Sequence, residues 1–241
     1  GFEDSMIYPV FAPLATDYGI LSEEERGSGA LLVDIGAGTT EYDVECNSGV
    51  RASGVLQVGF DHVCNDLAVG LDLNIGVCRK LVEDGSLSRA IREHRDCLEF
   101  PGSSVGTPRR IPLNSFETII DLRLRETFEI IKQILNEKNA LSQLEAGGIL
   151  TGGGAMFERT GAMFREVFEM SCRIAQPLEN GDPVALAENP RFSTVWGALR
   201  LAVAYNAMEP GGSGRGGFGS LLDMVDSLVS RTRKKLWNRR G

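Results

Sequence analysis

The stretch LLVDIGAGTTEYDVE, residues 31–45, contains residue types that could hold a phosphate. An apolar run ends on Asp34, and a short polar bend follows it. The bend consists of Gly36, Ala37, Gly38, Thr39 and Thr40. Without Cβ atoms, successive backbone N–H groups can converge on a phosphate, and the two threonine hydroxyls add donors. Asp34 would then hold a magnesium ion through its water shell. The alternative is a tight β-hairpin whose glycines adopt positive φ.

A second glycine run, TGGGA, follows another short apolar run. It predicts a bend between a buried strand and a helix, formed by Gly152, Gly153, Gly154 and Ala155. A flat ligand such as a nucleoside could lie against this bare backbone, and the start of the following helix favours anions. The alternative is a glycine turn that only packs the helix onto the sheet.

The elements that must position these bends follow from hydrophobic periodicity. Residues 30–35 are typical of a strand buried on both faces, and alternation after them predicts a three-strand meander that ends near residue 58. Apolar spacing predicts a helix from Phe60 to about Leu71. The sequence also predicts a long helix that begins at an N-cap, Ser115, and ends at about residue 138. A strand is expected from residue 147, followed by a helix that ends at Phe168. An edge strand at 172–177 and a final helix over 192–206 complete the predicted elements.

This order of elements and glycine bends matches one half of the actin/Hsp70-like ATPase fold. The sequence resembles that superfamily and, within it, the FtsA family of bacterial cell-division proteins. SEEERGSGALLVDIGAGTTEYDV, GFDHVCNDLAVGL, GGILTGGGA and the basic amphipathic end carry the likeness. The resemblance implies an α/β fold, the second half of an actin-like (RNase H-like) ATPase with an inserted small subdomain and a C-terminal amphipathic helix.

The resemblance also implies a domain division. It assigns 1–22 to the end of a first lobe, 23–71 and 115–206 to subdomain IIA, 72–114 to an inserted subdomain IIB, 207–219 to a flexible linker, and 220–241 to a membrane-targeting helix. The first residue is not methionine, and we expect a carboxy-terminal portion of a longer protein, with the first phosphate loop upstream. At most a slow ATPase is expected, with the nucleotide acting mainly as an assembly switch.

By the same resemblance, Asp34 to Thr40 match the second phosphate loop and Thr151 to Ala155 match the adenosine motif. The implied cofactors are ATP and Mg²⁺, and the implied partners are the tubulin-like division ring protein FtsZ, other copies of the protein in a filament, and anionic lipids. In the family, a glutamate and a lysine on one helix face the ribose and base of the nucleotide. This sequence has Cys78 and Leu81 at the corresponding positions, and the neighbouring Arg79 or Lys80 is expected to take their place. The family's contact with the ring protein falls near 85–112, where the match is weak.

Composition limits the remaining possibilities. Five cysteines without a CxxC pair argue against a disulfide framework or a zinc site, and fit a reducing cytosol. No apolar run approaches the roughly 20 residues of a transmembrane helix. The net charge is −8, but residues 211–241 carry seven Lys and Arg against two Asp. This asymmetry argues against nucleic-acid binding and for a dedicated cationic tail.

The cationic tail has the pattern of an amphipathic helix after the glycine-rich stretch GGSGRGGFGS. Its predicted membrane-binding residues are Leu221, Leu222, Val225, Leu228, Val229, Arg231, Arg233, Lys234, Lys235, Leu236, Trp237, Arg239 and Arg240. Such a helix lies in the membrane interface, where each basic residue adds about 1 kcal/mol near anionic lipid. A basic helix that binds a groove on a partner protein is the alternative.

The leading hypothesis is a peripheral protein on the cytoplasmic face of the bacterial inner membrane, which binds ATP, polymerises, and anchors the division ring at the septum. One alternative is the pilus-assembly actin homologue, a cytoplasmic platform protein. Another is a phosphotransferase similar to sugar or acetate kinases, which shares the two glycine motifs.

Overall fold

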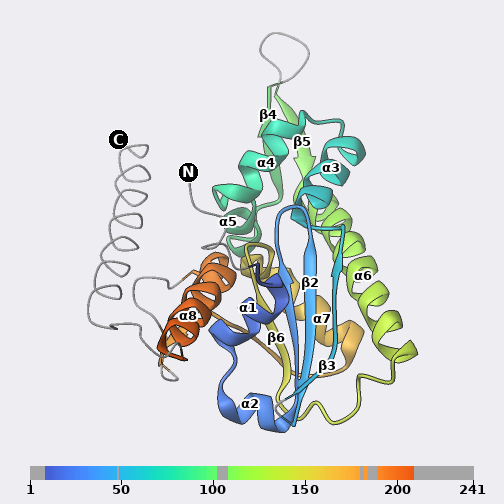
Figure 1. The fold of residues 1–241 in the computed structure, drawn as a ribbon. Helices are drawn as coiled ribbons and strands as arrows, with labels where there is room; N and C mark the ends of the chain where they lie inside the picture. Colours follow the sequence, from blue (N-terminus) through green and yellow to red (C-terminus); the bar gives the residue numbers. More distant parts are fainter. Residues whose placement is uncertain (1–8, 48, 102–107, 180–181, 184–188, 209–241) are drawn as a thin grey trace. The chain divides into compact units, whose positions relative to one another are not determined.

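The computed structural model describes residues 9–47, 49–101, 108–179, 182–183 and 189–208 (Figure 1). It divides into two compact units, one of Gly1–Leu21 with Gln176–Gly241 and one of Ser22–Ala175. The predicted tail helix and most of the predicted linker lie outside the described residues. Within the described helices, none is long and apolar enough to cross a membrane.

A mixed five-stranded sheet forms the centre of the larger unit, in the order β3-β2-β1-β6-β7 (Figure 1). The strands are β1 (Ala30–Ile35), β2 (Thr40–Cys46), β3 (Gly49–Leu56), β6 (Gly147–Thr151) and β7 (Cys172–Ile174). β1 runs antiparallel to β2 and parallel to β6. The continuous apolar run that predicted a buried β1 is confirmed, because the strand has a neighbour on each side and its first four residues are buried. β7 is an edge strand, as predicted.

One face of this sheet packs against three helices, α3 (Phe60–Gly70), α6 (Leu113–Glu137) and α7 (Glu158–Phe168). Alternate residues of β1 and β2 enter this core, as period-2 strands require. An aromatic cluster joins α6 to α7: the rings of Phe128 and Phe164 meet edge to face, with centroids 5.5 Å apart. Such pairs are worth about 0.5–1.5 kcal/mol beyond the area they bury.

The predicted N-cap of the long helix is wrong. α6 begins at Leu113, with Pro112 at its N-cap position, so Ser115 lies inside the first helical turn. Pro112 ends a β-strand with φ −58°, which lets the chain pass from strand to helix without a turn. The predicted end near residue 138 is confirmed.

The insertion expected after α3 contains two short helices and a hairpin. The elements are α4 (Ile75–Glu83), α5 (Ser86–Arg92), β4 (Cys97–Phe100) and β5 (Arg109–Pro112). The segment that follows α4 is helical through Arg92, His94 has a φ of 51°, and the chain then enters β4. Short α2 (Glu23–Ser28) precedes the sheet with a capping box between Ser22 and Glu25.

The smaller unit is built around α1 (Ala12–Ile20) and α8 (Ser193–Met208), with the short strands β8 (Leu178–Glu179) and β9 (Asp182–Pro183) and a 3₁₀ turn, η4 (Pro190–Phe192). The two helices cross through small residues, since a Cβ on Gly197 would overlap the Ala15 carbonyl. The hydroxyls of Thr16 and Thr194 lie 2.7 Å apart at the crossing. Close backbone contact therefore requires glycine here.

Candidate nucleotide-binding site

The two glycine bends meet at one edge of the sheet. β1 and β6 are parallel neighbours, and Asp34 is directly opposite Thr151, so both strands deliver their bends at their carboxyl ends. A Cβ on Gly152 would overlap the Asp34 carboxylate, which shows that the second bend lies against the end of β1. Crevices at the carboxyl ends of strands are where open α/β sheets bind ligands. Residues more than 100 positions apart in the sequence are thus brought together as the phosphate hypothesis requires.

The first bend rests on the start of α3. The N–H of Phe60 donates to the Gly36 carbonyl over 2.9 Å, and the N–H of Asp61 donates to the Ala37 carbonyl over 2.8 Å. Gly36 closes the bend itself with a 2.9 Å bond from its N–H to the Thr39 carbonyl. Two helix donors that would otherwise have no partner are therefore used to hold the bend in place.

The two threonines of the bend have different surroundings. Thr40 is fully buried, and its hydroxyl donates to the Val58 carbonyl over 2.7 Å. That hydroxyl hydrogen is thus used by the fold, although the sequence predicted a phosphate donor. Thr39 is only half-buried. Of the two hydroxyls, that of Thr39 is the better placed for a ligand.

The glycines of the first bend do not have the conformation that the hairpin alternative requires. Neither Gly36 nor Gly38 has a positive φ. Gly38 is exposed, and a Cβ built on it would have no described atom within 4 Å. The fold itself therefore gives no reason for glycine at position 38. Bare backbone facing open space is what close approach of a ligand needs.

The glycines of the second bend do have a packing role. Gly152 has a φ of 82°, which favours glycine. A Cβ on Gly154 would lie 2.5 Å from Ile35 Cγ2 and 2.6 Å from Phe60 Cδ2. Gly154 and Ala155 are buried within the 3₁₀ turn η2 (Gly154–Met156), whereas Gly153 is half-buried. The packing alternative thus explains Gly152 and Gly154, and leaves Gly153 as the more accessible backbone.

Two carboxylates face each other across the strands that flank the first bend. Asp34 on β1 is directly opposite Glu41 on β2. Burial and the nearby charge of Asp34 raise the pKa of the Glu41 carboxyl. Glu41 Oε2 is buried and has no hydrogen-bond partner among the described residues. Like charges directly across a sheet destabilise it, whereas a cation or its water shell would stabilise the pair. These residues therefore fit a magnesium ion.

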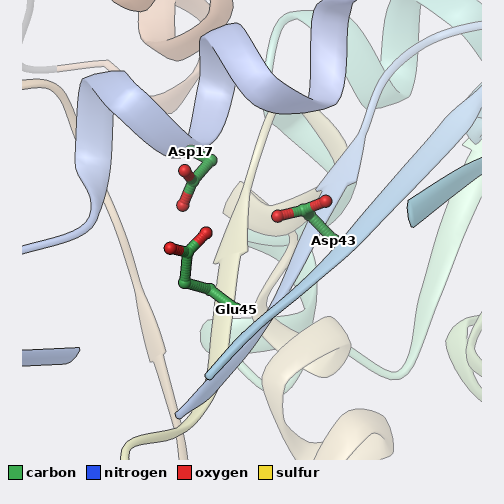
Figure 2. Close-up of side chains that lie close together, drawn as sticks. All are labelled: Asp17, Asp43 and Glu45. Atoms are coloured by element: carbon green, nitrogen blue, oxygen red, sulfur yellow. The ribbon is translucent and has the colours of Figure 1, made fainter. Parts of the chain in front are cut away.

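The acidic side chains continue along β2. Figure 2 shows Asp43 and Glu45 extending from this strand, and Asp17, which belongs to the smaller unit, extending from α1. Glu45 lies 3.7 Å from the Arg26 guanidinium. The sequence signal for this acidic face is the alternation of acidic with apolar residues in EYDVEC, which also predicts a strand.

The helix expected to face the ribose and base is α4. Cys78 is fully buried in the core and Leu81 packs against it, so neither of these two side chains points to a ligand. Arg79 is half-exposed, and its Nε lies 3.4 Å from Asp61 Oδ1. Because Asp61 also bonds the first bend through its backbone, Arg79 is connected to that bend by a single intervening residue.

A second surface feature is a groove between α3 and α6, of about 570 Å³. Its apolar residues include Val69, which is 76% exposed, and Leu122, which is 63% exposed. Arg123 also lines the groove and forms ion pairs with Asp66 and Glu126. Exposed apolar side chains in a groove with a charged rim are typical of a protein-binding surface.

The surroundings of Cys64 and His62 fit roles in packing and capping. Burial, with a smaller effect of the Asp61 charge, raises the pKa of the Cys64 thiol to about 11, so it stays protonated. His62 Nδ1 accepts a hydrogen bond from the Gly59 N–H over 3.2 Å, as expected of a capping residue.

Comparison with protein families gives a match over most of the larger unit. The family model described as "Cell division protein FtsA" matches residues 31–197. The FtsA protein of Borreliella burgdorferi is 29% identical over 192 residues, which cover 79% of this chain and 46% of that protein. The FtsA protein of Escherichia coli K12 is 29% identical over 198 residues, or 79% of this chain and 47% of that protein. The chain therefore spans about half the length of these relatives.

Solved structures of actin-like proteins share the fold. MreB5 of Spiroplasma citri bound to ADP matches with a TM-score of 0.59 at 16% identity, covering 80% of this chain and 59% of that one. A MamK double helical filament matches with a TM-score of 0.54 at 18% identity, covering 79% and 58%. At such identities the likeness establishes the fold alone, and it confirms the predicted actin-like α/β fold class; the predicted C-terminal helix lies outside the described residues.

Proposed function

The chain belongs to the FtsA family of cell-division proteins, and on this premise we propose that it forms the second half of an ATP-binding, actin-like protein that polymerises at the inner membrane and links the division ring to it. Family membership favours this function over the pilus-assembly and phosphotransferase alternatives.

The observation that carries the nucleotide proposal is the environment of Gly38. Its backbone is bare, it faces open space, and no strain or crowding in the described fold calls for glycine. The second bend lies against the same strand end, which supports one ligand in contact with both bends. The structural neighbour MreB5 is bound to ADP, and this supports the choice of an adenine nucleotide.

In the proposed site, each residue has a limited role. The N–H groups around Gly38 and the Thr39 hydroxyl bind phosphate oxygens, and Gly153 offers backbone to the nucleoside. Asp34 and Glu41 orient water molecules around Mg²⁺, which would supply charge neutralisation for the phosphates. Asp34 does not contact phosphate directly, because like charges repel. With half of a typical relative's length present here, turnover is not assigned to this chain.

The test substitutes Gly38→Ala and compares it with Gly27→Ala. Gly27 also has no described atom within 4 Å of a built Cβ, but it lies on α2, away from the bends. We expect Gly38→Ala to leave the urea midpoint unchanged and to weaken Mg-ATP binding at least about tenfold, or about 1.4 kcal/mol. Titration of a fluorescent ATP analogue measures this. Equal affinity of the two variants would contradict the proposal.

We place the ring protein on the groove between α3 and α6. Val69 and Leu122 are exposed apolar side chains in this groove, which fits a short apolar peptide. The charged residues that line it carry both signs, and its two arginines are paired with Asp66, Glu126 and Glu166. The arginines of segment 85–112 offer less: Arg95 pairs with its neighbour Glu93, and Arg92 is exposed at the last turn of the short α5.

Polymerisation and membrane attachment complete the proposal. The MamK neighbour forms a double helical filament, which supports self-association of this chain. The basic, apolar pattern of 220–241 supports attachment to anionic lipid. We therefore propose that the protein lies on the cytoplasmic face of the inner membrane.

A further inference from the structure

We propose that the outer edge of β3 binds an extended peptide segment of a partner protein, which adds to the five-stranded sheet as a further strand. The chemistry of the edge defines this segment. It has alternating apolar residues, a carboxylate or amide opposite Gly54, and an acidic residue near Arg51. The inference depends neither on the nucleotide site nor on the groove between α3 and α6.

The backbone of β3 is open to a further strand. β3 is the outer strand of the sheet and pairs with β2 on its other side. Because a strand bonds through both of its edges, alternate N–H and C=O groups of β3 point away from β2. Among the described residues, only β2 bonds to the backbone of Ala52–Leu56. Val55 is 43% exposed in this stretch.

Features that protect a sheet edge from pairing occur at one end of β3 only. A bulge interrupts the register there, with Arg51 as the extra residue between Val50 and Ala52. Arg51 Nη1 also donates to the Ser142 carbonyl over 2.7 Å, which fixes this end. From Ala52 to Leu56 the register with β2 is unbroken, and the segment contains no charged residue and no proline. This part of the edge is therefore able to pair.

Tyr42 gives a second, independent observation. It lies directly opposite Gly54, and a Cβ on Gly54 would overlap its hydroxyl and ring. The ring therefore lies across Gly54, and the hydroxyl is above the last strand of the sheet. Tyr42 is only 5% exposed, yet its hydroxyl has no hydrogen-bond partner among the described residues. An unpaired buried hydroxyl is unfavourable, and an acceptor on an added strand would remove this penalty.

The Tyr42 hydroxyl selects the residue that lies opposite Gly54 on the added strand. Burial raises the pKa of the Tyr42 phenol, so the group keeps its hydrogen and can donate. Directly opposite residues of neighbouring strands have Cβ atoms about 4.5–5.5 Å apart. The hydroxyl is close to the place of a Gly54 Cβ, so aspartate or asparagine there could accept its hydrogen bond. Alanine or valine could not.

Charge selects an acidic residue toward the bulge. Arg51 is exposed, and its guanidinium donates to the Ser142 carbonyl and to Gln143 Oε1. It forms no ion pair with a carboxylate within the part of the chain that the structure describes. A carboxylate on the added strand would supply this missing charge.

A second copy of this chain fits the edge less well than a different protein. In a symmetric antiparallel pair of β3 strands, opposite residues lie on the same face of the joined sheet. Gly54 would then lie opposite Ala52, Gly54 or Leu56 of the other copy. None of these has a hydrogen-bond acceptor in its side chain, so the Tyr42 hydroxyl would stay unpaired.

The experiment uses a labelled peptide of sequence Val-Thr-Asp-Thr-Val-Glu, whose Asp lies opposite Gly54 and whose Glu lies opposite Arg51 when it runs antiparallel to β3. Fluorescence anisotropy measures its affinity for the intact chain. Tyr42→Phe should weaken binding about tenfold. The same variant should keep or raise the urea midpoint, because the hydroxyl has no partner to lose in the free protein. Tyr18→Phe removes the same group from α1 and should change neither.

Changes in the peptide separate the two acceptors. Replacing its Asp with Val should weaken binding to the unsubstituted protein about tenfold, and should cause little further loss in Tyr42→Phe. Additive losses would contradict a bond between the two groups. Replacing its Glu with Gln should weaken binding a few times, and less at high salt, because the contact with Arg51 is exposed.

Two peptides with N-methyl groups on alternate residues test strand addition itself. A strand bonds to β3 through one edge, so only the peptide whose methyl groups face away should bind and slow hydrogen exchange at Ala52–Leu56. The proposal is overturned if the unmodified peptide does not bind, if both methylated peptides bind alike, or if Tyr42→Phe binds as tightly as Tyr18→Phe. Dimers of the chain that the peptide separates would assign the edge to a second copy and would also overturn it.

Discussion

Gly38 and Gly154 illustrate how one residue type has two uses in the same site. Gly154 is needed by packing, because any side chain would meet Ile35 and Phe60. Gly38 is not needed by packing or by backbone conformation, and its backbone faces open space. Sequence motifs treat both glycines alike. Only their surroundings separate the glycine that packing requires from the glycine to which we assign contact with a ligand.

Glu25 is a residue whose charge matters for stability rather than for binding. Its carboxylate accepts hydrogen bonds of 2.6 and 2.8 Å from Arg173, which joins α2 to β7. Burial alone would raise the pKa of the Glu25 carboxyl, but the bonds and charge of Arg173 and the bonds from Ser22 outweigh it and lower this pKa. The charged form is therefore favoured by folding.

We predict that Glu25→Gln lowers the free energy of unfolding by about 1 kcal/mol at pH 7. The effect is smaller than for a fully buried ion pair, because Arg173 is partly exposed to solvent. The lowered pKa means that this stabilisation is present above the unfolded-state pKa of about 4.3 and is lost as pH falls through the folded-state value. The difference between variant and parent should thus shrink below about pH 4. Urea unfolding across this range measures it, with exposed Glu24→Gln as control. A penalty that does not change with pH would contradict this account.

At the scale of elements, α6 serves two surfaces. Its buried side, through Phe116, Ile120 and Phe128, packs on the sheet. Its other side carries Leu122 into the groove shared with α3. Leu122 is 63% exposed, although the opposite side of the same helix already packs on the core. The helix therefore has an apolar side chain that the fold does not bury. This excess is the reason for placing a partner there.

We predict that Leu122→Ser weakens binding of a peptide from the ring protein about tenfold, or about 1.4 kcal/mol, because a buried leucine anchor typically contributes that much or more. Ile130→Ser is the control, since Ile130 is 36% exposed on the same helix but does not line the groove. Fluorescence anisotropy of a labelled peptide measures both affinities. Equal weakening by the two variants, or none by Leu122→Ser, would rule out this groove.

At the scale of the whole molecule, the chain belongs to a cell-division family and covers about half the length of its relatives. The site edge formed by β1 and β6 contains elements from one unit only. A complete nucleotide site in an actin-like protein would need residues besides these two bends. We therefore propose that the bends bind the nucleotide, and we do not propose that they hydrolyse it.

We predict that the intact chain sediments with anionic vesicles and that a chain ending at Asn206 does not. The tail carries six Lys and Arg residues between 231 and 240. Each contributes about 1 kcal/mol to binding near anionic lipid, so together they add several kcal/mol to the binding free energy of the inserted apolar side chains. Binding should therefore weaken with neutral vesicles and with added salt. Equal partitioning of both chains would show that the tail does not attach the protein to membranes.

The sequence alone predicted the five strands of the main sheet, the three helices that pack on it and the positions of the two glycine bends, but not the hairpin of β4 and β5. Local signals carry this information, because hydrophobic period and glycine content depend on near neighbours. It misplaced the start of α6, where Pro112 at the strand end competes with Ser115 as a cap. It also assigned Thr40 to a ligand, although the hydroxyl bonds Val58, 18 residues away.

Tertiary structure decided what depends on contacts between distant segments. Parallel pairing of β1 with β6 brings the two bends together, and the register of α4 turns Cys78 inward and leaves Arg79 beside Asp61. Neither result has a local signal, since strand order and helix rotation are set by burial across the whole core. The sequence determined which residue types are available to bind a phosphate, and the fold determined that the two glycine bends lie at the same edge of the sheet.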